Sequence, residues 1–155
     1  MYFNELLNYN PDDPQSKSTK SETVDVKLAA ATLMFNVIES DGETHRMEVA
    51  HMIDILKSHF CLSSYEISEL FESARERSNT GAEVENLTQH LCKNLNPKER
   101  KQLLNDFWQI ATADKKIHTG ERLMIDKIAK KLDLDAKVIV RARYNAEQRL
   151  ELNIA

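Results

Sequence analysis

The chain has 155 residues, which is enough for a single domain that buries a substantial core without disulfide or metal cross-links. Hydrophobic residues make up 41% and charged residues 30%, an ordinary balance for a soluble globular protein. Only three glycines and three prolines are present, fewer than an all-β fold needs for its many turns. The net charge of −4 and the pI near 5.8 argue against the basic surface that nucleic-acid binding requires.

The N-terminal segment differs in composition from the rest of the chain. Residues Asn10–Ser21 (NPDDPQSKSTKS) are polar, include two prolines and show no apolar period, which predicts a flexible linker. With a short helix expected over Phe3–Asn8, residues 1–21 form an appendage and residues 22–155 the domain. The first residues lack the pattern of a secretory signal, and no stretch reaches the length of a membrane span. We therefore expect a cytoplasmic protein with no integral membrane segment.

From Glu22 onward, apolar residues recur at helical spacing in successive segments. The stripes are Leu28, Ala31, Phe35 and Ile38; Val49, Met52, Ile53, Leu56 and Phe60; Ile67, Leu70, Phe71 and Ala74; Val84, Leu87, Leu91 and Leu95; Leu104, Phe107, Trp108 and Ala111; Ile125, Ile128, Ala129 and Leu132; and a last helix over Ala136–Leu150. Ser63 with Glu66 is typical of a capping box, and Asn96 is a helix cap followed by proline. No segment alternates with period two, so the prediction is an all-α fold, a compact bundle of about seven helices.

The strongest signal in the sequence is an internal repeat. A shift of 114 − 41 = 73 residues places the segment 27–41 over the segment 100–114. The turns that follow then match at Asp41 and Asp114, at His45 and His118, and at Glu48 and Glu121. We expect two copies of a helix–turn–helix unit, related by a pseudo-two-fold axis.

These two units resemble the tellurite-resistance TerB family. An Ala-rich helix that ends in Asp-Gly-Glu, with a glutamate seven residues after the aspartate (Asp41 and Glu48), is similar to the first half of a TerB-like domain. The segment Asn96–Glu121, whose aromatic-rich helix ends in Ala-Asp, is similar to the second half. The resemblance covers Val24–Tyr144. It implies an all-helical bundle, no known catalytic activity and binding of divalent cations by acidic residues, here in a stand-alone bacterial member.

The chain departs from the family pattern at two places. The second turn reads Asp114-Lys115-Lys116 where the family usually has Asp-Gly-acid, so two cationic residues adjoin the expected ligand. His45 and His118 occupy a position that is variable and polar in the family. The first departure weakens the case for a metal at the second turn.

The acidic turns suggest a cation site. Asp41 and Asp114 fall near the C-terminal ends of predicted helices, where the helix dipole disfavours a carboxylate, and a local rule broken twice suggests a compensating role. With Glu48 and Glu121, they would form a weak site for a hard cation of the Ca²⁺ or Mg²⁺ class, built from both copies. Auxiliary ligands would come from Glu43, His45 and His118.

A simpler interpretation of the same residues needs no metal. Asp41 would form an Asx-turn that closes the loop between the helices, and Gly42 would supply the unusual backbone angles. Glu48 would then complement the dipole of the helix it begins. Both interpretations remain open from the sequence.

The histidines allow a third hypothesis. His45 and Glu48, like His118 and Glu121, lie at i, i+3, which places an imidazole and a carboxylate on one helical face. Paired motifs of this kind build dinuclear sites in ferritin-like bundles, so a zinc or di-iron metalloenzyme is conceivable. The order of the residues is reversed here and supporting glutamates are missing, which favours exposed first-turn histidines.

The remaining reactive side chains carry no ligand spacing. Surface or half-buried positions suffice for His51, His59 and His90, and the two cysteines, Cys61 and Cys92, are expected to be buried thiols.

The predicted function is a non-enzymatic binding or regulatory module that senses a divalent cation and is linked to tellurite or other stress resistance. Its partner is expected to be another protein and not nucleic acid, while the oligomeric state stays open. The alternatives are a metal-free adaptor that holds a partner helix in a groove between the copies, and a metalloenzyme using the His–Glu pairs.

Overall fold

The computed structural model describes the backbone of residues 16–40, 46–77 and 83–154. These residues form seven α-helices and no strand, which confirms the predicted all-α fold. In chain order the helices are α2 (Ser16–Ile38), α3 (Arg46–Phe60), α4 (Ser64–Arg77), α5 (Glu83–Asn94), α6 (Pro97–Ala111), α7 (Thr119–Lys131) and α8 (Ala136–Ile154).

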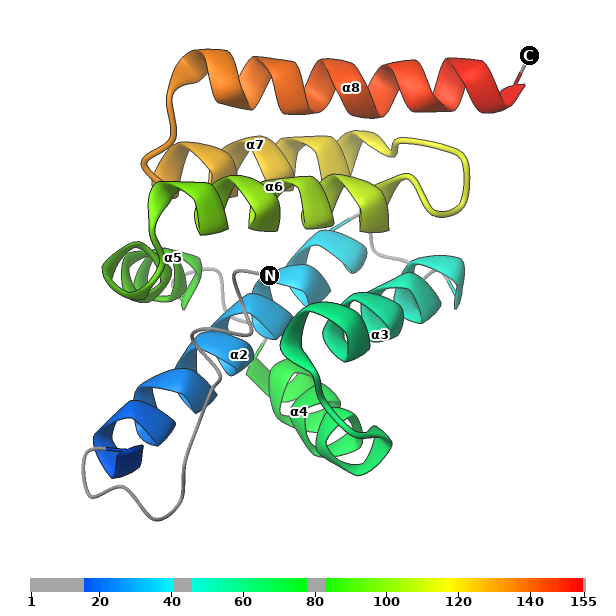
Figure 1. Ribbon diagram of the computed structural model, residues 1–155. Coiled ribbons are helices and arrows are strands. Elements are labelled where there is room, and N and C mark those ends of the chain that lie inside the picture. Colours follow the sequence, from blue (N-terminus) through cyan, green and yellow to red (C-terminus); the bar gives the residue numbers. More distant parts are fainter. Residues whose placement is uncertain (1–15, 41–45, 78–82, 155) are drawn as a thin grey trace.

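Helix α2 is the centre of the bundle. It packs against α3, α4, α5, α6 and α7, and α8 packs on α6 and α7. In Figure 1, α6, α7 and α8 lie side by side with similar axis directions, whereas α2, α3 and α4 run obliquely below them. The first helix of the domain is therefore enclosed by the later ones.

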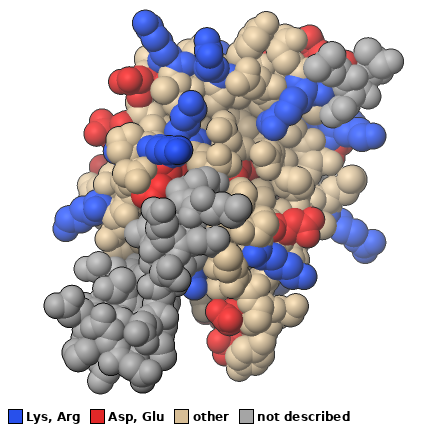
Figure 2. Space-filling view, viewed as in Figure 1, with Lys and Arg blue, Asp and Glu red and all other residues tan. Residues whose placement is uncertain are grey.

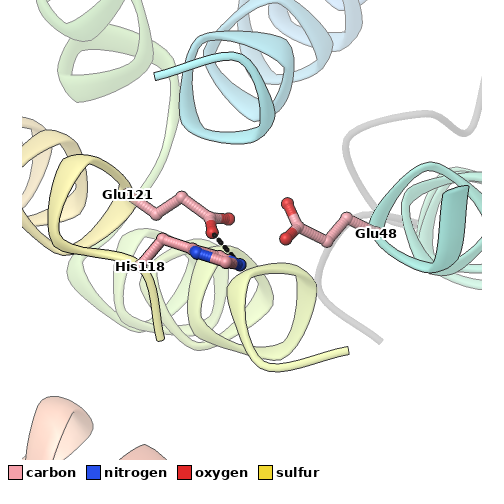
Figure 3. A group of neighbouring side chains, drawn as sticks. All are labelled: Glu48, His118 and Glu121. Atoms are coloured by element: carbon pink, nitrogen blue, oxygen red, sulfur yellow. Dashed lines mark ion pairs between the residues drawn. The ribbon is translucent and has the colours of Figure 1, made fainter. Parts of the chain in front are cut away.

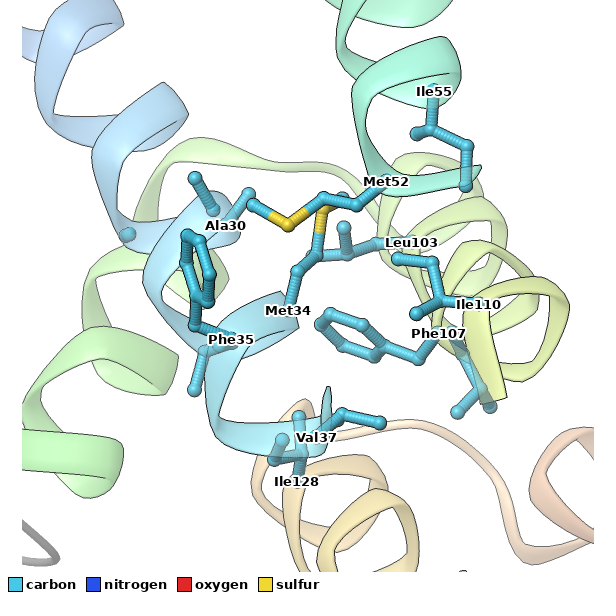
Figure 4. Packing of buried hydrophobic residues seen from close by; sticks show 14 of the residues in the cluster. Ala30, Met34, Phe35, Val37, Met52, Ile55, Leu103, Phe107, Ile110 and Ile128 are labelled. Carbon is cyan, nitrogen blue, oxygen red and sulfur yellow. The ribbon is translucent and has the colours of Figure 1, made fainter. Parts of the chain in front are cut away.

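The sequence of α2 explains its central position. Val26 and every residue from 29 to 38 are buried, so the helix is enclosed on all sides over its second half. The run Ala29–Ala31 has small side chains that allow close approach of neighbouring helices. Met34 and Phe35 fill the larger spaces, where Met34 lies near Phe107 of α6 (Figure 4). This packing anchors the ends of α2 and α6, from which the two repeat turns leave.

Both predicted helix caps are present, as a full capping box at Asn96 and as half of one at Ser63, whose hydroxyl donates to the Glu66 carboxylate. The Asn96 side chain accepts a hydrogen bond of 2.8 Å from the Glu99 amide, and the Glu99 carboxylate accepts one of 2.9 Å from the Asn96 amide. The Ser63 hydroxyl accepts a hydrogen bond of 3.2 Å from the Glu66 amide. These caps fix the first turns of α6 and α4.

Arg100 joins the ends of two helices. Its guanidinium is buried and donates hydrogen bonds to three backbone carbonyls, those of Leu95 (3.3 Å), Leu132 (2.6 Å) and Asp133 (3.0 Å). These carbonyls follow α5 and α7, where a helix leaves acceptors without intrahelical partners. The positive charge also complements the negative ends of both helix dipoles.

The predicted linker is wrong in its last part. Helix α2 begins at Ser16, so residues 16–21 continue the helix that the sequence pattern starts at Glu22. Apolar periodicity detects a helix only where one face is buried among neighbours, so a polar first turn escapes it. The expected helix over Phe3–Asn8 lies outside the described residues.

The packing of the helix pairs bears on the predicted repeat. In the repeat, α2 corresponds to α6 and α3 corresponds to α7. The contact of α3 with α6 therefore corresponds to the contact of α7 with α2, and both contacts exist. Two related helix pairs would give this pattern. The pseudo-two-fold axis itself stays a prediction.

The surface carries charges of both signs. On the face shown in Figure 2, lysines and arginines are interspersed with aspartates and glutamates over the described residues. None of the described helices combines the length and the apolar character that crossing a bilayer requires.

Candidate functional site

Two glutamates occupy the same position in different helices. Glu48 is the third residue of α3 and Glu121 the third residue of α7, so each lies in a first turn. Both are 0% exposed. The positive end of the helix dipole favours a carboxylate at this position, but it does not require the side chain to leave solvent. Their burial is the feature that the sequence did not reveal.

The two glutamates and His118 point toward one another. Figure 3 shows Glu48 approaching from α3, and His118 and Glu121 approaching from the start of α7. One ligand atom from each of the three residues lies within 4.8 Å of the other two. His118 Nε2 lies 3.8 Å from Glu121 Oε1, as the i, i+3 spacing predicts. The side chain of His118 is only 28% exposed, so the expectation of an exposed histidine was wrong here.

The electrostatics of this cluster favour positive charge near the two glutamates. Two carboxylates taken out of water each lose hydration free energy, and at this separation their charges repel each other. A buried set of like charges is tolerated when a cation or a proton lies among them. Glu48, His118 and Glu121 are therefore the described residues best placed to hold a cation.

Asp114 shapes the turn that precedes α7. Its Oδ1 accepts a hydrogen bond of 3.1 Å from the Lys116 amide, which is an Asx-turn, and its Oδ2 lies 2.9 Å from His118 Nε2. Lys115 adopts a left-handed conformation with φ 67, at the position that the 73-residue offset matches to Gly42. The side chains of Lys115 and Lys116 are exposed. The turn thus has the metal-free geometry predicted for Asp41, and Asp114 adjoins the cluster through His118.

The first repeat turn lies outside the described residues. This turn contains Asp41, which was predicted as a main ligand of the cation, and Glu43 and His45, which were predicted as auxiliary ligands. Of the four main ligands expected from the sequence, the structure brings Glu48 and Glu121 together, with Asp114 beside them through its contact with His118.

Comparison with known proteins identifies the family. A family model described as tellurite resistance protein TerB matches residues 27–144. The chain belongs to the TerB family. The matched span runs from within α2 to within α8 and includes Glu48, Asp114, His118 and Glu121. No curated protein and no solved structure matches the chain.

This TerB-family chain has a second ionisable pair, a half-buried histidine on a buried aspartate, which sequence reasoning missed. Nδ1 of His59, at the end of α3, lies 3.0 Å from Oδ2 of Asp106 on α6. Gln102 donates a hydrogen bond of 3.1 Å to the other oxygen of the same carboxylate. The partners are 47 residues apart and on different helices, so no local spacing could have indicated them.

The pKa values of this pair are shifted by its surroundings. The hydrogen bond that His59 donates to the Asp106 carboxylate raises the pKa of His59 above 6.5, against the opposing effect of partial burial. Burial raises the pKa of Asp106, whereas the hydrogen bonds from His59 and Gln102 act in the opposite direction. The close contact favours a protonated imidazole beside a carboxylate, so the ion pair ties α3 to α6 at pH values below the raised pKa of His59.

The cysteines of this TerB-family protein differ in exposure. Cys61 is exposed, so the expectation of a buried thiol was wrong. Cys61 follows the last residue of α3 and has a left-handed φ of 54, so its side chain does not continue the apolar stripe of that helix. Cys92 is half-buried and donates a hydrogen bond of 3.4 Å to the Lys131 carbonyl. Desolvation raises the pKa of the Cys92 thiol, which keeps it protonated and unreactive at neutral pH.

Proposed function

We propose that this TerB-family chain is a non-enzymatic cytoplasmic module that binds a divalent cation between α3 and α7 and reports its presence to a partner protein. The observation that carries the proposal is the convergence of two fully buried glutamates from two separate helices. Asp114 contacts His118 of the same cluster, and Asp41 is a further ligand that we expect from the predicted repeat.

Charge supports the proposal. Glu48 and Glu121 together carry two negative charges when ionised, and one divalent ion balances both. Ligand atoms on one ion lie about 2.0–2.6 Å from it, so two of them are no more than about 5 Å apart. The separation of up to 4.8 Å among the three ligand atoms falls within that limit.

The position of the glutamates supports a regulatory role. Glu48 belongs to α3, which packs on α6, and Glu121 belongs to α7, which packs on α2. An ion shared by both would cross-link the two helix pairs, whereas its loss would leave two carboxylates that repel each other. Cation concentration would then change how firmly α3 is held, and a partner protein that contacts α3 would detect this change.

A titration of amide resonances tests the proposal. Wild-type protein should show shifts at Glu48 and Glu121 when Ca²⁺, Mg²⁺, Mn²⁺ or Zn²⁺ is added, and the shifts should vanish in Glu48→Gln. Glu66→Gln is a matched control, because Glu66 is also the third residue of its helix but is exposed. Glutamine retains the capping interaction there. Unchanged resonances around both buried glutamates at millimolar concentrations of every ion would refute cation binding.

We further propose a link to tellurite or another stress, which is supported by the description of the matched family. The test is growth of a host that lacks the protein, complemented by the wild type or by Glu48→Gln, with and without tellurite. Equal tolerance of tellurite in the strains carrying the wild type and Glu48→Gln would show that the cation site has no role in tellurite resistance.

The metal-free adaptor is a second candidate function, supported by a cleft of about 480 Å³ beside α3. Met47 and His51 line it from α3, Gln109 from α6 and Leu150 from α8. Met47 is 57% exposed and offers an apolar contact to a partner helix. A partner captured equally well with and without chelator, and lost in Met47→Glu, would favour the adaptor over the cation sensor.

A further inference from the structure

We infer that His118 is a direct ligand of the cation and that it makes the site prefer a transition-metal ion of the Zn²⁺ class over Ca²⁺ and Mg²⁺. This inference rests on the proposed cation site and specifies which ion it takes. It replaces the hard-cation class expected from the sequence, which counted His118 only as an auxiliary.

The position of His118 is not explained by the helix that it begins. His118 is the N-cap of α7, with extended φ −79 and ψ 143, yet its side chain makes no capping hydrogen bond. Histidine is a poor choice for an N-cap, where Asn, Asp, Ser or Thr would satisfy the free amides of the first turn. Its imidazole instead faces the carboxylates of Asp114 and Glu121, at 2.9 and 3.8 Å from Nε2.

The donor set has the chemistry of a transition-metal site. Glu48 and Glu121 supply carboxylate oxygens and His118 supplies an imidazole nitrogen (Figure 3). Imidazole is a common ligand of Zn²⁺, Fe²⁺ and Ni²⁺, whereas Ca²⁺ and Mg²⁺ are held by oxygen atoms. A neutral imidazole also adds a ligand without adding negative charge to a buried site. Zn²⁺ also binds to three protein ligands with a fourth position for water, most often two histidines and one glutamate, where this cluster offers one histidine and two glutamates.

Burial favours the same ion class. Ca²⁺ takes six to eight oxygen ligands and Mg²⁺ retains several waters, so both need room for many oxygen atoms. Glu48 and Glu121 are 0% exposed, which leaves little space for a hydration shell around an ion between them. Four-coordinate Zn²⁺ needs the fewest ligands of the three ions. Ligand atoms at about 2.0–2.2 Å from a tetrahedral Zn²⁺ lie about 3.3–3.6 Å apart, so the three side chains, whose ligand atoms lie within 4.8 Å of one another, would close around the ion when it binds.

The alternative is that His118 only closes the turn through its hydrogen bond with Asp114. Variants at this position separate the two roles. His118→Asn replaces the imidazole by an amide oxygen and installs a good N-cap, so α7 should stay folded. His90→Asn is the matched control, because His90 lies on α5 and its ring contacts Asn94, not the cluster.

The experiment measures affinities for Zn²⁺ and Ca²⁺ by competition with a chromophoric chelator, for wild type and both variants. His118→Asn should weaken Zn²⁺ binding at least about 100-fold, because losing an outer-shell partner alone costs about 10–100-fold. Its Ca²⁺ affinity should change less than about threefold, since an oxygen replaces a nitrogen that Ca²⁺ does not need. His90→Asn should match the wild type for both ions.

A second readout does not depend on any variant. When Zn²⁺ is added to wild-type protein, the ring ¹⁵N resonances of His118 should move into the range of a metal-bound imidazole, while those of His90 stay in place. This result holds even if His118→Asn proves unstable.

Each result has a defined meaning. Absence of binding by any ion defeats both the proposed function and this inference. Binding that depends on Glu48 and Glu121 but leaves the His118 ring unaffected overturns the inference and keeps the cation site. Equal loss of Zn²⁺ and Ca²⁺ affinity in His118→Asn, with no ring shift in the wild type, shows that the residue only positions the turn and also overturns the inference.

Discussion

Replacing Glu121 by glutamine should make the cation-free protein more stable while abolishing its cation binding. Glutamine preserves the shape of the side chain and removes its charge. Glu121 is fully buried, and its ligand atom lies within 4.8 Å of that of Glu48. The substitution therefore removes the repulsion between two buried carboxylates.

The size of the effect follows from the geometry. Two unit charges 4.8 Å apart repel each other by 332/(20 × 4.8), or about 3.5 kcal/mol, at an effective dielectric constant near 20. Relaxation of the surrounding side chains offsets part of this repulsion. We therefore expect Glu121→Gln to raise the free energy of unfolding by about 1–3 kcal/mol in the absence of cation.

Urea unfolding with and without a divalent ion measures this effect. At about 100 times the dissociation constant, binding should stabilise the wild type by about 2.7 kcal/mol and leave Glu121→Gln unchanged. Glu66→Gln, at an exposed first-turn position, should stay within about 0.5 kcal/mol of the wild type throughout. A cation-free Glu121→Gln protein less stable than the wild type by more than 1 kcal/mol would refute the reasoning from charge repulsion.

Three further predictions concern residues outside the cluster. Asp106 raises the pKa of His59 above 6.5, so the stabilisation from their contact is full below about pH 6.5 and is lost as the pH rises through the raised pKa. The difference in unfolding free energy between wild type and His59→Gln should therefore be larger at pH 6 than at pH 8.5. Arg100→Met should cost about 2–4 kcal/mol in urea unfolding, because two buried carbonyls and one part-buried carbonyl lose their donor, while exposed Lys101→Met should be nearly neutral. Lys115→Gly should raise the free energy of unfolding by about 0.5–1 kcal/mol, because Lys115 has a left-handed φ of 67; a lower free energy of unfolding would contradict this.

The fold was predictable because the apolar stripes are long and regular. Met52, Leu56 and Phe60 in α3, and Ile125 and Ile128 in α7, are all buried as the helical spacing requires. The start of α2 was not predictable from the same pattern, since polar first turns carry no periodic signal. Apolar periodicity indicates which face of a helix is buried, and it gives no signal where no face of the helix is buried.

The candidate site was only partly predictable. The repeat paired Glu48 with Glu121, and the i, i+3 spacing placed His118 beside Glu121; both relations hold in the structure. Burial was missed, because a first-turn glutamate is equally favourable in solvent and the deciding contacts come from other helices. The Asp106–His59 pair was missed for the same reason, since its partners meet only when α3 packs on α6.

The most direct test of the central claim is a crystal structure of the protein grown with Zn²⁺ or Mn²⁺, with an anomalous difference map recorded at the absorption edge of the metal. The account predicts one strong peak among the side chains of Glu48, His118 and Glu121, within about 2.0–2.6 Å of their ligand atoms. A map with no peak there, or with peaks only at exposed acidic residues, would contradict it.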